Sequence, residues 1–160
     1  MLVENYPFFA TYPGDIVRTY LPITIVNPEN YKEITVYALI DTGADECALP
    51  ASFASLLGHN LQCGHQKTVG TGNGETVVYT HTVCIKVFDF STENVLIDFL
   101  PNLHVPLLGV RSFLNNFTLK IDYPNKVFSI RNNSATKTLM HENNSQTEEL
   151  KNKRTIKSTF

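Results

Sequence analysis

Short apolar runs separated by proline, glycine and asparagine fill residues 1–131 and constrain the fold more than any other feature of this sequence. The longest, residues 75–88, alternates apolar and polar side chains at Val77 and Tyr79 and again at Val83, Ile85 and Val87. Such alternation is typical of a half-buried β-strand. The pattern predicts an all-β barrel or sandwich with strands at residues 18–26, 33–40, 66–69, 75–88, 95–100, 118–122 and 126–131. Short helices are expected at residues 51–57 and 111–116.

The composition fits one packed domain followed by a polar extension. The chain has 160 residues, of which 42% are hydrophobic and 18% are charged, values that suit a globular core. Residues 132–160 are instead rich in Asn, Thr, Lys and Glu and contain few large apolar side chains. Because so little apolar surface cannot offset the entropy lost on ordering, we expect a flexible C-terminal tail there.

Charge, hydropathy and cysteine content argue against several classes of protein. A formal net charge of −2 disfavours nucleic acid as a partner. The uncharged apolar stretches are far shorter than the ~20 residues of a membrane-spanning helix, so no membrane contact is expected. The N-terminus lacks the pattern of a signal peptide, which predicts a cytoplasmic protein. The three cysteines have no regular spacing and are expected to be free thiols: Cys47, Cys63 and Cys84.

The most informative local feature is an apolar run that stops at a carboxylate. Residues 37–40 are apolar and lead directly into Asp41, Thr42 and Gly43. A charge at the end of a buried strand is costly unless it sits in a turn, accepts hydrogen bonds or shares a proton with another acid. Gly43 permits close approach of the backbone, and the Thr42 hydroxyl can hold the loop by hydrogen bonding. The tripeptide alone also fits a turn in which Asp41 caps its own loop.

Two segments further along the chain also combine apolar or β-type runs with glycine. Residues 69–75 contain Gly70, Gly72 and Gly74 between two β-type runs, which predicts a mobile hairpin tip. Residues 105–109 form a second apolar run that stops at Gly109, and a short helix is expected directly after it.

The order of these parts resembles the retropepsin-like aspartic proteases, single-domain relatives of pepsin. The resemblance covers residues 16–131, between an N-terminal segment (1–15) and the tail (132–160). It implies a closed β-barrel with one or two short helices and a flap hairpin. It also implies that Asp41 is the catalytic acid within a loop shared with Thr42 and Gly43. The substrate contacts that it implies are Ala44, Asp45, Gly70, Thr71, Gly72, Asn73 and Gly74.

The chain departs from the viral members of that family at one position. In the viral pattern an arginine directly follows the glycine that opens the helix, whereas here Val110 stands between Gly109 and Arg111. Whether Arg111 forms an ion pair with Asp45 or is a plain surface arginine is therefore left open.

Peptide hydrolysis by this route requires two carboxylates about 3 Å apart that share one proton. The chain contains a single Asp-Thr-Gly, and no other aspartate is followed by Thr-Gly or Ser-Gly. A second copy of the chain, related by a twofold axis, would supply the missing carboxylate. We therefore expect a homodimeric aspartic endopeptidase that acts on protein or peptide substrates and uses no cofactor and no metal.

Three features of the sequence also fit other functions. His59, Cys63 and His65 lie close together in the sequence, with His81 and Cys84 further along, but their spacing matches no recognised zinc module. Cys47 follows the Asp41 loop and could be imagined as a nucleophile, although its apolar surroundings favour a packed thiol. The main alternative is a noncatalytic dimerisation or peptide-binding module that keeps the protease fold.

Overall fold

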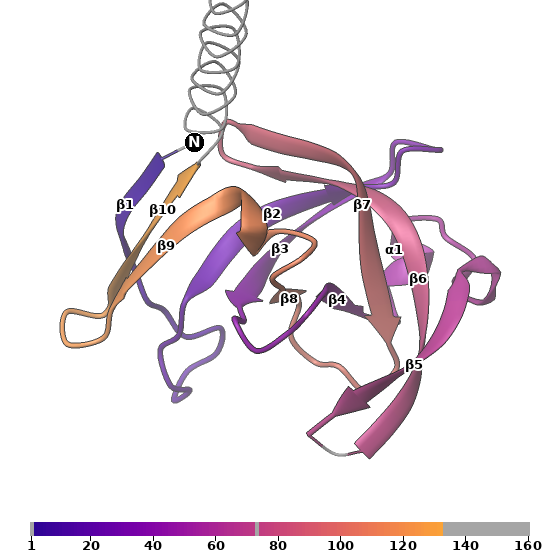
Figure 1. Cartoon of the computed structure of the whole chain (residues 1–160), viewed down its shortest axis with the longest axis horizontal. Coiled ribbons are helices and arrows are strands. Elements are labelled where there is room, and N and C mark those ends of the chain that lie inside the picture. Colours follow the sequence, from indigo (N-terminus) through magenta and orange to yellow (C-terminus); the bar gives the residue numbers. More distant parts are fainter. Residues whose placement is uncertain (1, 73, 133–160) are drawn as a thin grey trace, which may run out of the picture.

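The computed structural model describes residues 2–72 and 74–132 and is dominated by β-strands (Figure 1). Its strands are β1 (Leu2–Pro7), β2 (Tyr20–Val26), β3 (Glu33–Ile40), β4 (Cys47–Pro50), β5 (His65–Thr71), β6 (Gly74–Val87), β7 (Phe90–Leu100), β8 (Leu107–Leu108), β9 (Phe117–Asp122) and β10 (Val127–Asn132). The helical elements are α1 (Phe53–Leu56) and the 3₁₀ turns η1 (Leu61–Cys63) and η2 (Leu114–Asn116). The all-β class predicted from the sequence is confirmed. Asn73 and, apart from Asn132, the predicted tail at 132–160 lie outside the described residues.

The main sheet has seven strands in the order β2-β3-β8-β4-β7-β6-β5. The β3–β8 and β4–β7 pairs are parallel, and the other neighbours are antiparallel. An additional antiparallel pairing brings β2 back against the second half of β6. The sheet therefore curls around its apolar core, while the β5–β6 hairpin projects from the body of the molecule (Figure 1).

A smaller sheet joins the first and last described strands of the chain in the order β1-β10-β9. Strand β1 was not expected from the sequence. Its pairing with β10 shifts register between Val3 and Tyr6, and Asn5 between them has φ of 51°. Because this irregularity breaks the period-two pattern, the sequence gives no clear strand signal there. The proposed limits of the N-terminal segment stay a prediction, although its first strand forms part of this sheet.

The core is filled by side chains that alternate along β2 and along the second half of β6. Val83, Ile85 and Val87 are buried, as the alternation predicts. In the first half of β6 the buried residues are Val78 and Thr80, whereas Val77 is 40% exposed. The prediction that Val77 shares the buried set is therefore wrong. This half of the strand belongs to the projecting hairpin and pairs with β5, so its covered face is set by different neighbours.

Short elements differ most from the sequence-based expectations. The helix expected at 51–57 is limited to α1, and the one expected at 111–116 is the single 3₁₀ turn η2. Strand β4 was missed because all of its residues are buried, so that no alternation marks it. Within the described residues, no helix has both the length and the apolar character needed to span a membrane.

Candidate active site

Asp41 follows directly on β3, where this strand lies beside β8. The Leu39 N–H donates to the Pro106 carbonyl at 2.8 Å, and the Asp41 N–H donates to the Leu108 carbonyl at 3.1 Å. Strand β3 is central in the sheet, so its backbone is held on both sides. The carboxylate therefore starts from a rigid strand end rather than from a free loop.

The loop after β3 is closed by the Asp41 residue itself. The Gly43 N–H donates to Asp41 Oδ1 at 2.9 Å, and the Ala44 N–H donates to the Asp41 carbonyl at 3.3 Å. A Cβ at Gly43 would lie 3.3 Å from the same Oδ1, so a side chain there would crowd the carboxylate. Asp41 is half-buried, while Thr42 and Gly43 are exposed. The carboxylate is oriented by a backbone donor and remains open to the surface.

A second loop, which begins at Gly109, is hydrogen-bonded to the Asp41 loop. The Val110 N–H donates to the Ala44 carbonyl at 2.9 Å, and the Arg111 N–H donates to the Asp45 carbonyl at 2.8 Å. A Cβ on Gly109 would lie 2.3 Å from the Glu46 carbonyl carbon and oxygen, a distance that no side chain tolerates. Glycine is therefore required at 109 by the close crossing of two backbones.

Cys47 lies behind these loops as a packed thiol. It is fully buried, its N–H donates to Ser112 Oγ at 3.2 Å, and its Sγ accepts the Gly109 N–H at 3.3 Å. Burial raises the pKa of the Cys47 thiol to about 12. A thiol that stays protonated and has no access to the surface is not a nucleophile.

Arg111 forms the ion pair that the sequence left open. Its guanidinium lies 3.4 Å from Asp45 and 3.6 Å from Glu46. The side chains of Arg111 and Asp45 are 66% and 78% exposed, so solvent screens this pair and its contribution to stability is small. The Glu46 carboxylate also accepts a hydrogen bond from the Ser112 hydroxyl.

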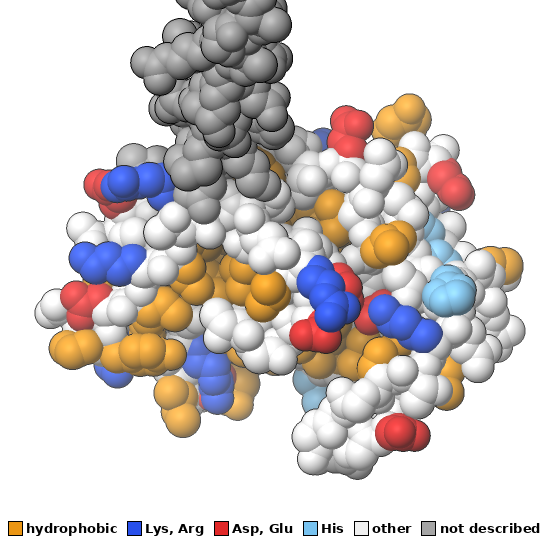
Figure 2. Space-filling view, viewed as in Figure 1, with side chains coloured by type: hydrophobic (Ala, Val, Ile, Leu, Met, Phe, Trp, Pro, Cys, Tyr) orange, Lys and Arg blue, Asp and Glu red, His pale blue; other side chains and the backbone are white. Residues whose placement is uncertain are grey.

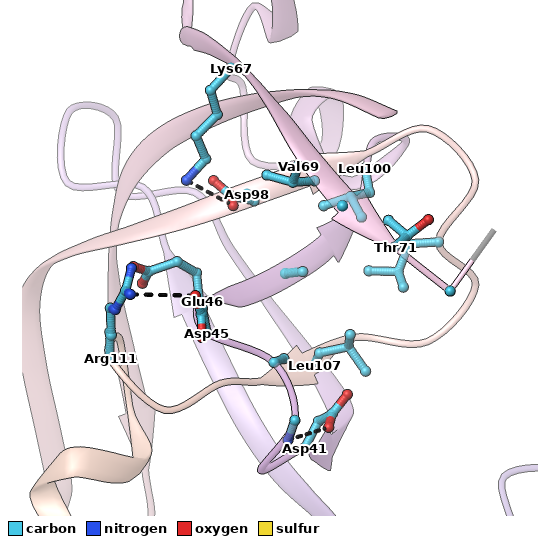
Figure 3. Close-up of a pocket in the computed structure, with 16 residues that line it drawn as sticks. Asp41, Asp45, Glu46, Lys67, Val69, Thr71, Asp98, Leu100, Leu107 and Arg111 are labelled. Atoms are coloured by element: carbon cyan, nitrogen blue, oxygen red, sulfur yellow. Dashed lines mark hydrogen bonds and ion pairs between the residues drawn. The ribbon is translucent and has the colours of Figure 1, made fainter. Parts of the chain in front are cut away.

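A cavity of about 780 Å³ opens between the Asp41 loop and the β5 strand of the projecting hairpin (Figure 3). Of the predicted site residues, it is lined by Asp41, Gly43, Ala44, Asp45, Gly70, Thr71 and Gly72. Thr42 and Gly74 do not line it, and Asn73 lies outside the described residues. Side chains of both charges gather beside the hollow on this face (Figure 2).

The fold and the Asp41 loop match a known family of proteins. The family model described as gag-polyprotein putative aspartyl protease matches residues 30–116, more than half of the chain. The chain belongs to this aspartyl protease family. Among solved structures it is similar to a retropepsin-like aspartic protease from Rickettsia conorii, with 26% sequence identity, a TM-score of 0.55, and coverage of 69% of this chain and 87% of that chain.

The chain is also similar to the solved structure of the EIAV protease in complex with the inhibitor HBY-793. The sequence identity is 20%, the TM-score is 0.47, and the match covers 66% of this chain and 93% of that chain. No curated protein matches the chain. The retropepsin-like recognition made from the sequence motifs is confirmed by the family match and the Rickettsia conorii structure.

Sequence reasoning missed part of the cavity lining of this aspartyl protease domain. The lining residues that the sequence did not indicate are Ala48, Lys67, Val69, Asp98, Leu100, Leu103 and Leu107. Glu46, which follows Asp45 in the sequence, and Arg111 also line the cavity. Among the residues that the sequence did not indicate, the Asp98 side chain is almost fully buried and lies 3.0 Å from Lys67 Nζ. An aspartate within the apolar run 95–100 was a usable signal, because a carboxylate rarely lies inside a buried strand without a partner.

The histidines weighed as metal ligands lie at a separate, smaller cavity of about 390 Å³. The His59 and His81 rings lie with their centroids 4.5 Å apart and their planes tilted by 37°, and His81 Nε2 lies 3.0 Å from the Leu61 carbonyl. His65 and Cys63 are exposed at the rim. The described residues bring together no group of three or more ligands suited to a metal ion.

Proposed function

We propose that this chain is an aspartic endopeptidase in which two Asp41 carboxylates, one from each subunit of a homodimer, activate the water that hydrolyses a peptide bond. The observation that carries the proposal is the Asp41 carboxylate in the lining of the 780 Å³ cavity, oriented by the Gly43 N–H and reachable from the surface. The family match to aspartyl proteases supports the same chemistry.

In the proposed mechanism the two carboxyl groups share one proton, because like charges so close together cannot both ionise. The ionised carboxylate takes a proton from water as the water oxygen attacks the peptide carbonyl carbon. The protonated carboxyl gives its proton to the carbonyl oxygen, which forms a tetrahedral diol. When the carbon–nitrogen bond breaks, the first carboxyl protonates the departing amine, the second recovers a proton from the diol, and the pair returns to its starting state.

The need for a second subunit follows from the single catalytic loop per chain. The chain surface near Asp41 has features that suit such a contact. Ile16 and Val17 are exposed and precede Thr19, whose carbonyl accepts the N–H of Ile40, the residue before Asp41. Exposed apolar side chains beside an incomplete site favour association with a second copy.

The substrate would be an extended peptide segment of a protein, added as a β-strand between the Asp41 loop and the β5–β6 hairpin. Gly70, Thr71 and Gly72 line the cavity from the hairpin side. We propose that this hairpin acts as a flap that closes over the bound peptide and excludes water. The reaction needs no cofactor, and a cytoplasmic location stays a prediction from the sequence.

Replacement of Asp41 by asparagine tests the proposal. Asp41→Asn removes the shared proton and the base, so cleavage of an unfolded protein at mildly acidic pH should fall by about 10²- to 10⁴-fold or more. The fold should persist by circular dichroism, and the dimer should persist by sedimentation, because asparagine has nearly the same shape.

The matched control is Glu93→Gln, an equivalent loss of one carboxylate at an exposed position of β7 that does not line the cavity. It should leave cleavage unchanged. A peptidomimetic with a tetrahedral hydroxyl should inhibit the wild type. Full activity of purified Asp41→Asn would refute the assignment, and a wild-type dimer that binds peptides but never cleaves them would favour the noncatalytic module.

A further inference from the structure

Two charged side chains from strands that are not neighbours meet inside the cavity. Lys67 on β5 reaches past β6 to Asp98 on β7, with 3.0 Å between Lys67 Nζ and Asp98 Oδ2 (Figure 3). The other oxygen, Asp98 Oδ1, accepts the Thr80 hydroxyl of β6 at 2.6 Å. The pair therefore forms a polar end of the cavity, built from three strands.

The two partners differ in the hydrogen-bonding capacity that they leave for a ligand. The Asp98 side chain is only 7% exposed, and each of its oxygens already has a partner. The Lys67 side chain is 34% exposed, and its ammonium has three donors, of which Asp98 takes one. A molecule that enters the cavity thus meets hydrogen-bond donors first, with a carboxylate directly behind them.

The walls beside this polar end are apolar. Residues two apart on a strand share a face, so Val69 lies on the same side of β5 as Lys67, and Leu100 on the same side of β7 as Asp98. Ala48 from β4 and Leu107 from β8 also line the cavity. A complementary side chain needs an apolar stem and a polar head.

The charges around the cavity disfavour a charged head group. The remaining ionic residues of the lining are Asp41, Asp45, Glu46 and Arg111. A cationic head would meet the Lys67 ammonium. An anionic head would compete with Asp98 for the same ammonium, close to three further carboxylates and one arginine that is already paired. An uncharged amide avoids both penalties: its carbonyl can accept from Lys67 while its NH₂ donates to a carboxylate oxygen.

We infer that the Lys67–Asp98 pair is a specificity-determining element of the cavity and selects a carboxamide side chain, glutamine or asparagine, at one position of the peptide substrate. The inference rests on the proposed endopeptidase function and adds the substrate class to it. The pair recognises the substrate and takes no part in the chemical step.

The test measures kcat/KM for peptides that carry Gln, Glu, Lys or Met at each of the four positions on either side of the cleaved bond. At the position that enters the cavity, Gln should exceed each of the other three by at least about tenfold, since hydrogen bonds to charged groups are lost or opposed in the others. Met has a similar length without the amide and is the apolar reference.

Variants of Lys67 test whether the preference for Gln depends on the Lys67–Asp98 pair. Lys67→Met should abolish the preference for Gln over Met at that position, and Lys67→Arg should retain it because it keeps donors at the same place. The matched control is Lys86→Met, which removes an exposed lysine of β6 paired with Glu33 at 3.5 Å and outside the cavity. Because Lys67→Met leaves Asp98 buried without its counter-ion, the double variant Lys67→Met/Asp98→Asn provides a neutral pocket if the single variant folds poorly.

The outcomes separate the two proposals. If the wild type cleaves peptides but shows no position with a preference for Gln, or if Lys67→Met and the double variant keep the wild-type preference, the carboxamide pocket is wrong and the endopeptidase stands. If the wild type cleaves no peptide and Asp41→Asn behaves identically, both proposals fail. A loss of preference in the Lys67 variants but not in Lys86→Met supports the inference.

Discussion

At the scale of single residues, the buried side-chain nitrogen and oxygen atoms of residues 2–72 and 74–132 have hydrogen-bond partners, with one exception. Asp41 accepts the Gly43 N–H, Asp98 is held by Lys67 and Thr80, and Asn27 donates to the Leu57 carbonyl. The exception among the described residues is His59 Nε2, which is buried without a hydrogen-bond partner. A buried imidazole nitrogen in this position disfavours the protonated ring.

This exception predicts how stability depends on pH. Burial, and secondarily the neighbouring His81, lower the pKa of His59 below its ordinary value of 6.5. As the pH falls below 6.5, the unfolded chain takes up a proton at this residue that the folded chain does not, so stability falls toward acid. His59→Gln should make the melting temperature less sensitive to pH between 7 and 5 than that of the wild type, because the proton-linked loss of stability at this residue is removed.

The comparison for this prediction is His104→Gln, at an exposed histidine. Thermal unfolding of both variants and the wild type would be followed by circular dichroism at pH 5, 6, 7 and 8. An acid decline in His59→Gln as steep as that of the wild type would show that His59 stays accessible to protons in the folded state. The result also sets the pH range in which cleavage assays report on folded protein.

At the scale of secondary-structure elements, the shortest strand, β8, joins the two strands beside the site. Strand β8 has two residues, yet it pairs in parallel with β3 and antiparallel with β4. The loop that follows it crosses the Asp41 loop at Gly109, where the two backbones leave no room for a side chain. The relative position of the two loops therefore depends on one glycine.

Gly109→Ala should consequently destabilise the protein by about 3 kcal/mol, because backbone atoms of Ala44 and Glu46 must move to admit the methyl group. Gly70→Ala is the matched control on the hairpin, where a Cβ would meet nothing within 4 Å, and its stability should change by no more than about 0.5 kcal/mol. Urea denaturation of both variants measures the difference. Equal stability of the two would mean that the crossing at Gly109 is looser than the distances indicate.

At the scale of the whole molecule, one chain provides a complete fold but only half of the proposed catalytic pair. The cavity at Asp41 is built by residues from β4, β5, β7 and β8 and from the loops that follow β3, β5, β7 and β8. In the proposed mechanism, the single carboxylate loop per chain makes activity a property of the dimer. Cleavage per chain should therefore fall as the protein is diluted below the dissociation constant of the dimer.

Ile16 tests this dependence. Its side chain is 70% exposed, and it precedes Thr19, whose carbonyl accepts the Ile40 N–H, by three residues. If this face forms the proposed dimer contact, Ile16→Ser should raise the dimer dissociation constant by at least about tenfold through the loss of buried apolar area. Leu56→Ser, at a 58% exposed leucine of α1, is the control and should leave association unchanged. Sedimentation at a series of protein concentrations measures the dimer dissociation constant of both variants. An unchanged dissociation constant for Ile16→Ser would show that the dimer interface lies on another face of the chain.

The amino-acid sequence alone determined the features that depend on neighbours within one strand or turn. Residues 33–40 were predicted as a strand with the bounds of β3, and the end of that run at Asp41 marked the loop that lies at the cavity. The glycines at 70, 72 and 74 likewise marked the turn between β5 and β6. These signals are local, because alternation and glycine geometry act within a few residues.

Only the tertiary structure decided which distant residues meet. Lys67 and Asp98 gave no joint signal in the sequence, and their contact requires the register of β5 on β6 and of β6 on β7 together. The pairing of β1 with β10 and the crossing of the loops after β3 and β8 depend on long-range pairing in the same way. The sequence of a strand indicates which of its faces is exposed and which is buried. Its partner strand and its register follow from the packing of the whole chain.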